Sequence, residues 1–436
     1  MRQLDQTHDP KLRSWVDSAN RHSDFPIQNL PFGVFRRAGQ DARGGVAIGD
    51  MIFDLREGAV LFTGDGAIAA GAAAGDDLVP LMALGQGPAG ALRAQLSRLL
   101  DAGQADDDAR QTAARCLVPM ETAELLLPAR VGAFTDMMTS TYHVSGGRRG
   151  APAQEPPGHF KSIPLGYNSR ASSLVVSGEP VTRPRGAFAD DGGAPRFGPE
   201  PWQDFELELG AFMGPGNRLG HPIPIAKAGE HIFGYCLLND WSARAIQFFE
   251  MAPLGPFLGK SLATSLSPWV ITADALAPFA NPAFVREAGD PELLEYLRDP
   301  EDQRSGGLDL ILEAHLWTPR MRAQGQAPAL IGSTNFRHMY WTLGQLVAHH
   351  TVNGCNLRPG DLIGSGTVSG PTDAACGCLW ELTSGGQVDF DLPNGERRLF
   401  LEDGDEVIFR ARAAREGHVS LGFGECRGRI SAALPG

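Results

Sequence analysis

Two acidic residues alternate with apolar ones in the middle of the chain. Glu206 and Glu208 are separated by one residue, within a stretch, 205–209, whose other members are apolar. Because successive side chains of a strand point to opposite faces, both carboxylates would share one face. Two such charges repel, so a site that keeps both ionised needs a cation, most simply a divalent metal with oxygen ligands, and Asp240 is a candidate third ligand. The alternative is a solvated edge strand with an acidic polar face.

A short helix is predicted directly after Asp240. Ser242 is a typical N-cap residue. The first two turns of this helix would then present Arg244, Gln247 and Met251 on one side. A guanidinium and an amide beside a carboxylate suit the binding of substrate oxygens, but a solvated helix face has the same composition.

Other reactive residues have weaker patterns. Asp136 and His143 lie seven residues apart, which says little without a partner for the histidine. The six cysteines have neither the spacing of a zinc ribbon nor that of a disulfide framework. Cys376 and Cys378 are close in sequence, and we interpret them as two small, half-buried thiols because no second pair accompanies them.

Composition limits the class of protein. The 436 residues are 42% hydrophobic and 20% charged, as in a soluble globular protein, and no run is long and apolar enough to span a membrane. The start of the chain lacks the apolar core of a signal peptide, so we expect a cytoplasmic protein. A net charge of −13 argues against a nucleic-acid or membrane partner and favours a small molecule.

The composition of the sequence changes near residue 125. Before it, short strand-like runs precede a helix-prone region, in which leucines at three- and four-residue spacing predict an amphipathic helix over 92–100. After it, strands alternate with loops rich in glycine and proline. Strand and helix do not alternate regularly, so we expect a mostly β (α+β) fold with two domains, 1–125 and 126–436.

Several blocks, in order along the chain, resemble the fumarylacetoacetase family. The likeness is weak before residue 125 and strong from about residue 160 onward. The blocks that carry it are Gly166–Tyr167, Arg170–Ser173, Glu206–Glu208, Gly214–Arg218, Asn239–Arg244, Pro253–Lys260, His349–Cys355 and Ser365–Pro371. The resemblance implies a small N-terminal SH3-like barrel, a larger mixed β-roll catalytic domain and a homodimer.

The resemblance also implies roles for individual residues. A Ca²⁺ or Mg²⁺ ion would be bound by Asp136, Glu206, Glu208 and Asp240, with support from Lys260 and Thr264. The catalytic set would be His143, Glu381, Arg244, Gln247 and Lys260, in which His143 is the general base and Glu381 its carboxylate partner. Tyr167, Gln247, Thr367, Met138 and Met251 would contact substrate.

The implied activity is metal-dependent hydrolysis of a carbon–carbon bond in a β-diketone acid. The substrate would be fumarylacetoacetate, which is cleaved to fumarate and acetoacetate in the catabolism of tyrosine and other aromatic compounds, or a related acylpyruvate-like diketone. Alternatives are an isomerase, decarboxylase or hydratase of the same fold, a natural-product tailoring enzyme and a non-catalytic metal-binding protein.

The chain departs from the family pattern around the substrate. Met138 and Met251 stand where the family has tyrosines, and Asn168–Ser169 replaces a His-Gly pair. The family's arginine for the substrate carboxylate has no clear counterpart, although Arg148 and Arg149 are near. Replacing phenols by thioethers removes hydrogen-bond donors and leaves flexible apolar surface, which predicts a pocket better suited to a less polar acyl chain.

Overall fold

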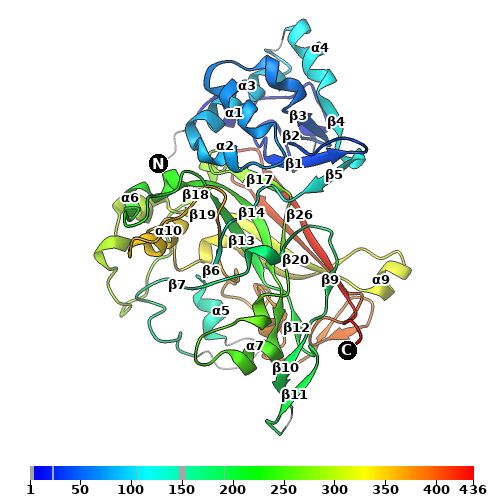
Figure 1. Ribbon diagram of the computed structural model, residues 1–436, viewed down its shortest axis with the longest axis vertical. Helices are drawn as coiled ribbons and strands as arrows, with labels where there is room; N and C mark the ends of the chain where they lie inside the picture. The colour runs from blue at the N-terminus through cyan, green and yellow to red at the C-terminus, as the bar shows by residue number, and fades with distance from the viewer. Residues whose placement is uncertain (1–3, 22–23, 105, 147–153, 191) are drawn as a thin grey trace.

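The computed structural model is a mixed α/β protein and describes residues 4–21, 24–104, 106–146, 154–190 and 192–436. An N-terminal part with four of the helices lies at one end, and the β10–β11 hairpin (Arg185–Ala189 and Pro195–Pro199) projects from the opposite end (Figure 1). The helices are α1 Gly64–Ala73, α2 Val79–Ala83, α3 Gln86–Leu100, α4 Asp107–Arg115, α5 Thr141–Ser145, α6 Ile225–Ala228, α7 Arg244–Glu250, α8 Pro300–Ser305, α9 Pro319–Ala323, α10 Leu343–Thr351 and α11 Leu379–Leu382.

A 13-stranded sheet forms the centre of the molecule, with ten strands in the order β4-β3-β2-β1-β17-β14-β13-β22-β6-β7. The other three branch from it: β5 pairs with β1, and β16 joins β8 to β14. Its strands are β1 Phe32–Arg37, β2 Arg43–Ile48, β3 Met51–Asp54, β4 Leu117–Pro119, β5 Ala123–Leu126, β6 Phe134–Met138, β7 Leu165–Asn168, β8 Leu174–Val176, β13 Leu207–Met213, β14 Ile232–Asp240, β16 Thr264–Leu266, β17 Trp269–Thr272 and β22 Leu362–Gly364.

A five-stranded sheet packs beside it in the order β21-β20-β25-β26-β9. These strands are β9 Val181–Thr182, β20 Leu310–Trp317, β21 Ala329–Asn335, β25 Glu406–Ala413 and β26 Leu421–Ser431. Two-stranded pairs complete the fold, among them β12 Gln203–Asp204 with β15 Ser242–Ala243, and the other short strands are β18 Ala280–Asn281, β19 Gly307–Leu308, β23 Phe390–Asp391 and β24 Arg397–Arg398.

The N-terminal part is continuous with the large sheet. Its strands β1–β3 run antiparallel, and β1 pairs directly with β17 of the larger part. The predicted helix over 92–100 is confirmed as the second half of α3, whose residues Leu92, Leu96 and Leu100 are fully buried. No helix of the described residues is long and apolar enough to cross a membrane.

Strand β13 has no solvated face, because both of its faces are covered. Leu207 and Leu209 point into the main core, whereas Phe212, on the other face, packs with the N-terminal hydrophobic cluster. Glu208 shares the face of Phe212, since side chains alternate along the strand. One face of the sheet therefore anchors the N-terminal part at one end and carries the acidic residues at the other.

The predicted N-cap of the helix after Asp240 is wrong. Ser242 belongs to strand β15, where it pairs with Asp204. Helix α7 begins at Arg244, and the carboxylate of Glu200 accepts hydrogen bonds from the backbone of Ala245 and Ile246. The cap is therefore supplied by a residue more than forty positions earlier, which local sequence cannot reveal.

Candidate metal centre and active site

Four carboxylates converge at one end of the large sheet. The four are Asp136 on β6, Glu206 just before β13, Glu208 on β13 and Asp240 at the end of β14. One oxygen of each lies within 4.8 Å of the others, and all four side chains are buried. The interpretation of Glu206 and Glu208 as a solvated strand edge is therefore wrong.

Gly364 makes this convergence possible. It lies on β22, the strand between β6 and β13, and pairs with Asp136 in parallel register. A Cβ atom at this position would lie 2.4 Å from Oδ1 of Asp136 and 3.0 Å from Oε2 of Glu208. Only glycine leaves room for the two carboxylates to meet across the intervening strand. The sequence analysis missed this residue, although it directly precedes the Ser365–Pro371 block.

Two buried cations offset part of the negative charge. Nη1 of Arg244 lies 2.7 Å from Oε1 of Glu206. Nζ of Lys260 lies 2.5 Å from Oε2 of Glu206 and 3.1 Å from Oδ2 of Asp240. Burial alone would lower the pKa of Lys260, but these carboxylates raise it above its ordinary value, so the ammonium stays charged.

Two hydroxyl groups also hold Asp240. The hydroxyl of Thr264 donates to Oδ1 at 2.7 Å. The phenolic oxygen of Tyr167 lies 3.0 Å from Oδ2 of Asp240 and 2.9 Å from Oδ2 of Asp136, so its one proton is shared between the two carboxylates. Burial, followed by the neighbouring carboxylates, raises the pKa of Tyr167 well above 10, so the phenol keeps its proton. Tyr167, predicted to contact substrate, thus also bridges two of the acidic residues.

The pKa values of the acidic residues differ sharply. Desolvation, with repulsion from Asp240, raises the pKa of Asp136 to about 7. Desolvation, followed by repulsion from Asp136 and Glu206, raises the pKa of Glu208 well above its ordinary value. Burial would also raise the pKa of Glu206, but Lys260 and Arg244 lower it below the ordinary range. Asp136 and Glu208, which lack the ion pairs with Arg244 and Lys260 that Glu206 makes, therefore bind protons more tightly than ordinary carboxyl groups unless another positive charge is present.

A divalent cation fits this donor set. Oδ1 of Asp136 and Oε1 of Glu208 are buried and have no hydrogen-bond partner among the described residues. Unpartnered carboxylate oxygens in a dry site are costly, and a hard cation with oxygen ligands would satisfy both. We therefore regard these residues as able to hold a hard divalent cation.

A histidine–glutamate pair lies beside the acidic cluster. Nδ1 of His143, on α5, is 2.6 Å from Oε1 of Glu381, on α11. The same oxygen accepts a 2.6 Å hydrogen bond from the hydroxyl of Ser369. With Nδ1 protonated and held by the carboxylate, Nε2 is left as the acceptor. The predicted pairing of His143 with Glu381 is thus present in the geometry.

Asp204 is a second residue that the sequence analysis missed. It is fully buried and accepts a 2.9 Å hydrogen bond from Nε of Arg244. It also accepts hydrogen bonds from the backbone of Leu379 and Trp380, at the start of the helix that carries Glu381. One carboxylate therefore fixes both Arg244 and the Glu381 helix. Its place directly before the 205–209 stretch was the signal available in the sequence.

The structure brings some of the remaining predicted residues to the site. Oε1 of Gln247 accepts from Arg244 at 3.4 Å, and the buried hydroxyl of Thr367 has no partner among the described residues. Met138 is half-buried on β6 against the main core, and Met251 is half-buried at the end of α7. Arg148 and Arg149 lie outside the described residues.

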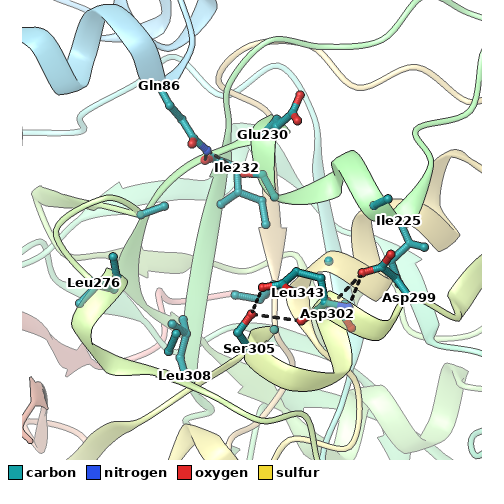
Figure 2. A pocket seen from close by; sticks show the side chains of 18 of the residues that line it. Gln86, Ile225, Glu230, Ile232, Leu276, Asp299, Asp302, Ser305, Leu308 and Leu343 are labelled. Carbon is teal, nitrogen blue, oxygen red and sulfur yellow. Dashed lines mark hydrogen bonds between the residues drawn. The ribbon is translucent and has the colours of Figure 1, made fainter. Parts of the chain in front are cut away.

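A separate cavity of about 340 Å³ lies where α3 meets the larger part of the protein. Figure 2 shows Gln86 above it, with Leu276, Leu308 and Leu343 among the residues lining it. Two of its acidic groups are already paired, since Asp299 caps α8 and Asp302 accepts hydrogen bonds from Thr342. It shares no residue with the acidic cluster, and we interpret it as a packing gap between the two parts.

A buried set of oxygen ligands beside a histidine–carboxylate pair is typical of metal-dependent enzymes. A family model described as "Fumarylacetoacetate (FAA) hydrolase C-terminal" matches residues 133–431, and one described as "Fumarylacetoacetase N-terminal" matches residues 28–128. The chain therefore belongs to the fumarylacetoacetase family.

Individual relatives agree with this assignment. The chain is 45% identical to the fumarylacetoacetase of Oryza sativa subsp. japonica, over 97% of this chain and 98% of that one. It is 44% identical to that of Homo sapiens, over 94% and 97%. Among solved structures, a fumarylacetoacetate hydrolase from Exiguobacterium antarcticum has a TM-score of 0.50 at 18% identity, covering 92% of this chain and 99% of that chain, which supports the fold.

Cation binding should strengthen as pH rises towards 7. With a pKa of about 7 when folded and 3.8 unfolded, Asp136 binds a proton more tightly in the native state, so the metal-free protein loses stability as pH rises between these values. A bound divalent cation must displace this proton and the one that Glu208 holds, so affinity should rise with pH by up to about tenfold per pH unit for each proton displaced. Calorimetric titrations at pH 5.5, 6.5 and 8 measure this.

Asp136→Asn is the matched variant for this titration. It keeps the size of the side chain but removes the titrating group, so cation affinity should be lower throughout and its pH dependence weaker. Equal affinities at all three pH values for the unaltered protein would contradict the assignment.

Proposed function

We propose that this protein hydrolyses fumarylacetoacetate to fumarate and acetoacetate. The observation that carries the proposal is the His143–Glu381 pair, with Nδ1 and Oε1 at 2.6 Å, placed beside the buried acidic cluster. Identity of about 45% over nearly the full length to proteins named fumarylacetoacetase supports this substrate. The pair also favours hydrolysis over isomerisation, decarboxylation or a purely structural metal site, because it supplies a base that can activate water.

His143 acts on the attacking water. Glu381 holds the proton on Nδ1, so Nε2 accepts a proton from water as it attacks the substrate carbonyl. The bond to the neighbouring carbon then breaks, and the electron pair leaves on the acetoacetate fragment. The new carboxyl group of the other fragment loses its proton to solvent, which gives fumarate. The imidazolium returns its proton to the acetoacetate fragment, so one water is consumed in each turnover.

Arg244, Lys260 and Gln247 stabilise the charge that develops on the substrate oxygens. Donors of this kind each lower the barrier by about 3 kcal/mol when they are held in place before reaction. Arg244 and Lys260 are held by Asp204 and Glu206, and their positions are therefore fixed in advance. A cation bound by Asp136, Glu206, Glu208 and Asp240, with Lys260 and Thr264 supporting them, supplies Lewis-acid polarisation of the diketone oxygens.

Substrate contacts complete the proposal. The unpartnered hydroxyl of Thr367 is available to donate to a substrate oxygen. Gln247 and the ring of Tyr167 would also contact the substrate, while the phenolic proton of Tyr167 stays hydrogen-bonded to Asp136 and Asp240. Met138 and Met251 would contact the acyl portion through apolar, flexible side chains. These roles rest on the family resemblance together with the burial of Thr367 and Gln247.

The fold of each domain is inferred from the same family resemblance. We infer that residues 1–125 form an SH3-like barrel and residues 126–436 a β-roll domain, supported by the antiparallel β4-β3-β2-β1 order and by β5 on the other side of β1. All six cysteines are free thiols, which favours a reducing compartment and hence the cytoplasm.

His143→Ala should lower kcat for fumarylacetoacetate by at least about 10²-fold, because the general base is lost. Loss of the diketone absorbance measures the rate. Cation affinity should be unchanged, since no acidic ligand is altered, and His221→Ala, an exposed histidine, should keep full activity. A variant at His143 that still hydrolyses the substrate at the normal rate would overturn the general-base assignment.

Fumarylacetoacetate should be preferred over simple acylpyruvates, because the chain is about 45% identical to proteins named fumarylacetoacetase. This preference replaces the prediction, made from Met138 and Met251, of a pocket suited to a less polar acyl chain. Both substrates carry the diketone that the cation, Arg244 and Lys260 would hold, so both should turn over, but kcat/KM should be higher for fumarylacetoacetate. The comparison uses the same absorbance assay with the two substrates at equal cation concentration. A higher kcat/KM for the acylpyruvate would assign the protein to a related diketone instead.

We also infer a homodimer, because a patch of apolar side chains is exposed on and after α7. Its members are Phe248 (43% exposed), Phe249 (42%), Leu254 (96%), Phe257 (63%) and Leu258 (52%). Large exposed apolar patches mark interfaces. Light scattering should give twice the mass of one chain, and Leu254→Ser combined with Phe257→Ser should shift it towards one chain. A monomer before substitution would contradict this inference.

A further inference from the structure

A thiol lies against the His143–Glu381 pair. Sγ of Cys378 is 3.5 Å from Oε1 of Glu381 and 4.0 Å from Nδ1 of His143. The ligand atoms of these three residues all lie within 4.8 Å of one another, separately from the acidic cluster. The proposed hydrolysis uses the histidine and the carboxylate but gives the thiol no part.

The three groups differ in kind from the ligands of the acidic cluster. Sulfur and imidazole nitrogen are the donors that zinc prefers, whereas Ca²⁺ and Mg²⁺ prefer oxygen alone. Zinc–ligand distances of about 2.0–2.3 Å place tetrahedral ligands about 3.3–3.7 Å apart. The two sulfur distances, 3.5 and 4.0 Å, are close to that range, and the 2.6 Å between Nδ1 and Oε1 would have to widen by under about 1 Å.

We propose that His143, Cys378 and Glu381 form a second, thiophilic metal site, which takes zinc and inhibits the enzyme when it is filled. Water would complete the tetrahedron. The side chain of Cys378 is buried, whereas that of His143 is 17% exposed, so the ion would enter from the histidine side. A hard cation bound by the acidic cluster would thus support the reaction, whereas a thiophilic cation bound at the neighbouring site would stop it.

Zinc binding would inhibit the enzyme because it changes which nitrogen of His143 carries a proton. Zinc binds the thiolate of Cys378 and Nδ1 of His143, so the thiol proton is released and the imidazole proton moves from Nδ1 to Nε2. The ion's two charges are then balanced by Cys378 and Glu381. Nε2 now carries a proton and cannot accept one from water. This inhibition rests on the proposed role of His143 as general base, whereas metal binding itself does not.

Cobalt absorption tests the site without any assay of activity. Co²⁺ is added to the full-length protein in excess Mg²⁺, which keeps the acidic cluster filled. A thiolate-to-cobalt charge-transfer band in the near ultraviolet should appear in the unaltered protein and in Cys376→Ser, and should vanish in Cys378→Ser. Cys376 is the matched control because it is also buried, but its thiol donates to the backbone of Asp373. No band, or an equal band in Cys378→Ser, overturns the proposal.

Zinc inhibition provides the second measurement. With Mg²⁺ in excess, zinc should inhibit the unaltered protein, and Cys378→Ser should keep its activity while requiring at least about tenfold more zinc, because one of three protein ligands is lost. Equal zinc sensitivity in the two proteins overturns the inhibitory role. If the protein fails to hydrolyse fumarylacetoacetate, the cobalt band still decides the metal site, so the two proposals fail separately.

Discussion

The burial of four carboxylates at one place is the constraint on which the rest of the site depends. Each charge removed from water is costly, and their mutual repulsion adds to that cost. Lys260 and Arg244 compensate Glu206 and Asp240, whereas unpaired oxygens of Asp136 and Glu208 remain. The arrangement is stable only with protons or a further cation, and this excess of negative charge would provide its affinity for a metal.

Hydrogen bonds from neighbouring elements hold the charged groups around this cluster in position. Asp204 ties Arg244 to the helix of Glu381, and Ser369 holds Glu381 towards His143. The reacting groups therefore come from segments up to 238 residues apart in sequence, yet the pair meets at 2.6 Å. Positions fixed before substrate arrives are what electrostatic catalysis requires.

Sequence patterns predicted some of this and failed elsewhere for identifiable reasons. The alternation over 205–209 correctly placed Glu206 and Glu208 close together, because strand geometry is local. It could not show that the face was buried, since burial depends on which strands lie on either side. Ser242 was wrongly predicted as a helix cap because Glu200 and the β12–β15 pairing compete with it. The sequence could not show that Cys378 lies beside His143, because 235 residues separate the two.

The sequence by itself determined the kind of chemistry, since blocks that resemble one family supplied acids, a base and cations of the right types. Only the tertiary structure decided which of them meet. Gly364 shows why: its lack of a side chain has meaning only once β22 lies between β6 and β13, with two carboxylates closing over it. Proximity across a sheet depends on strand order, which no single segment specifies, and so the candidate cation site and the contact between Cys378 and His143 result from the packing of distant strands and helices.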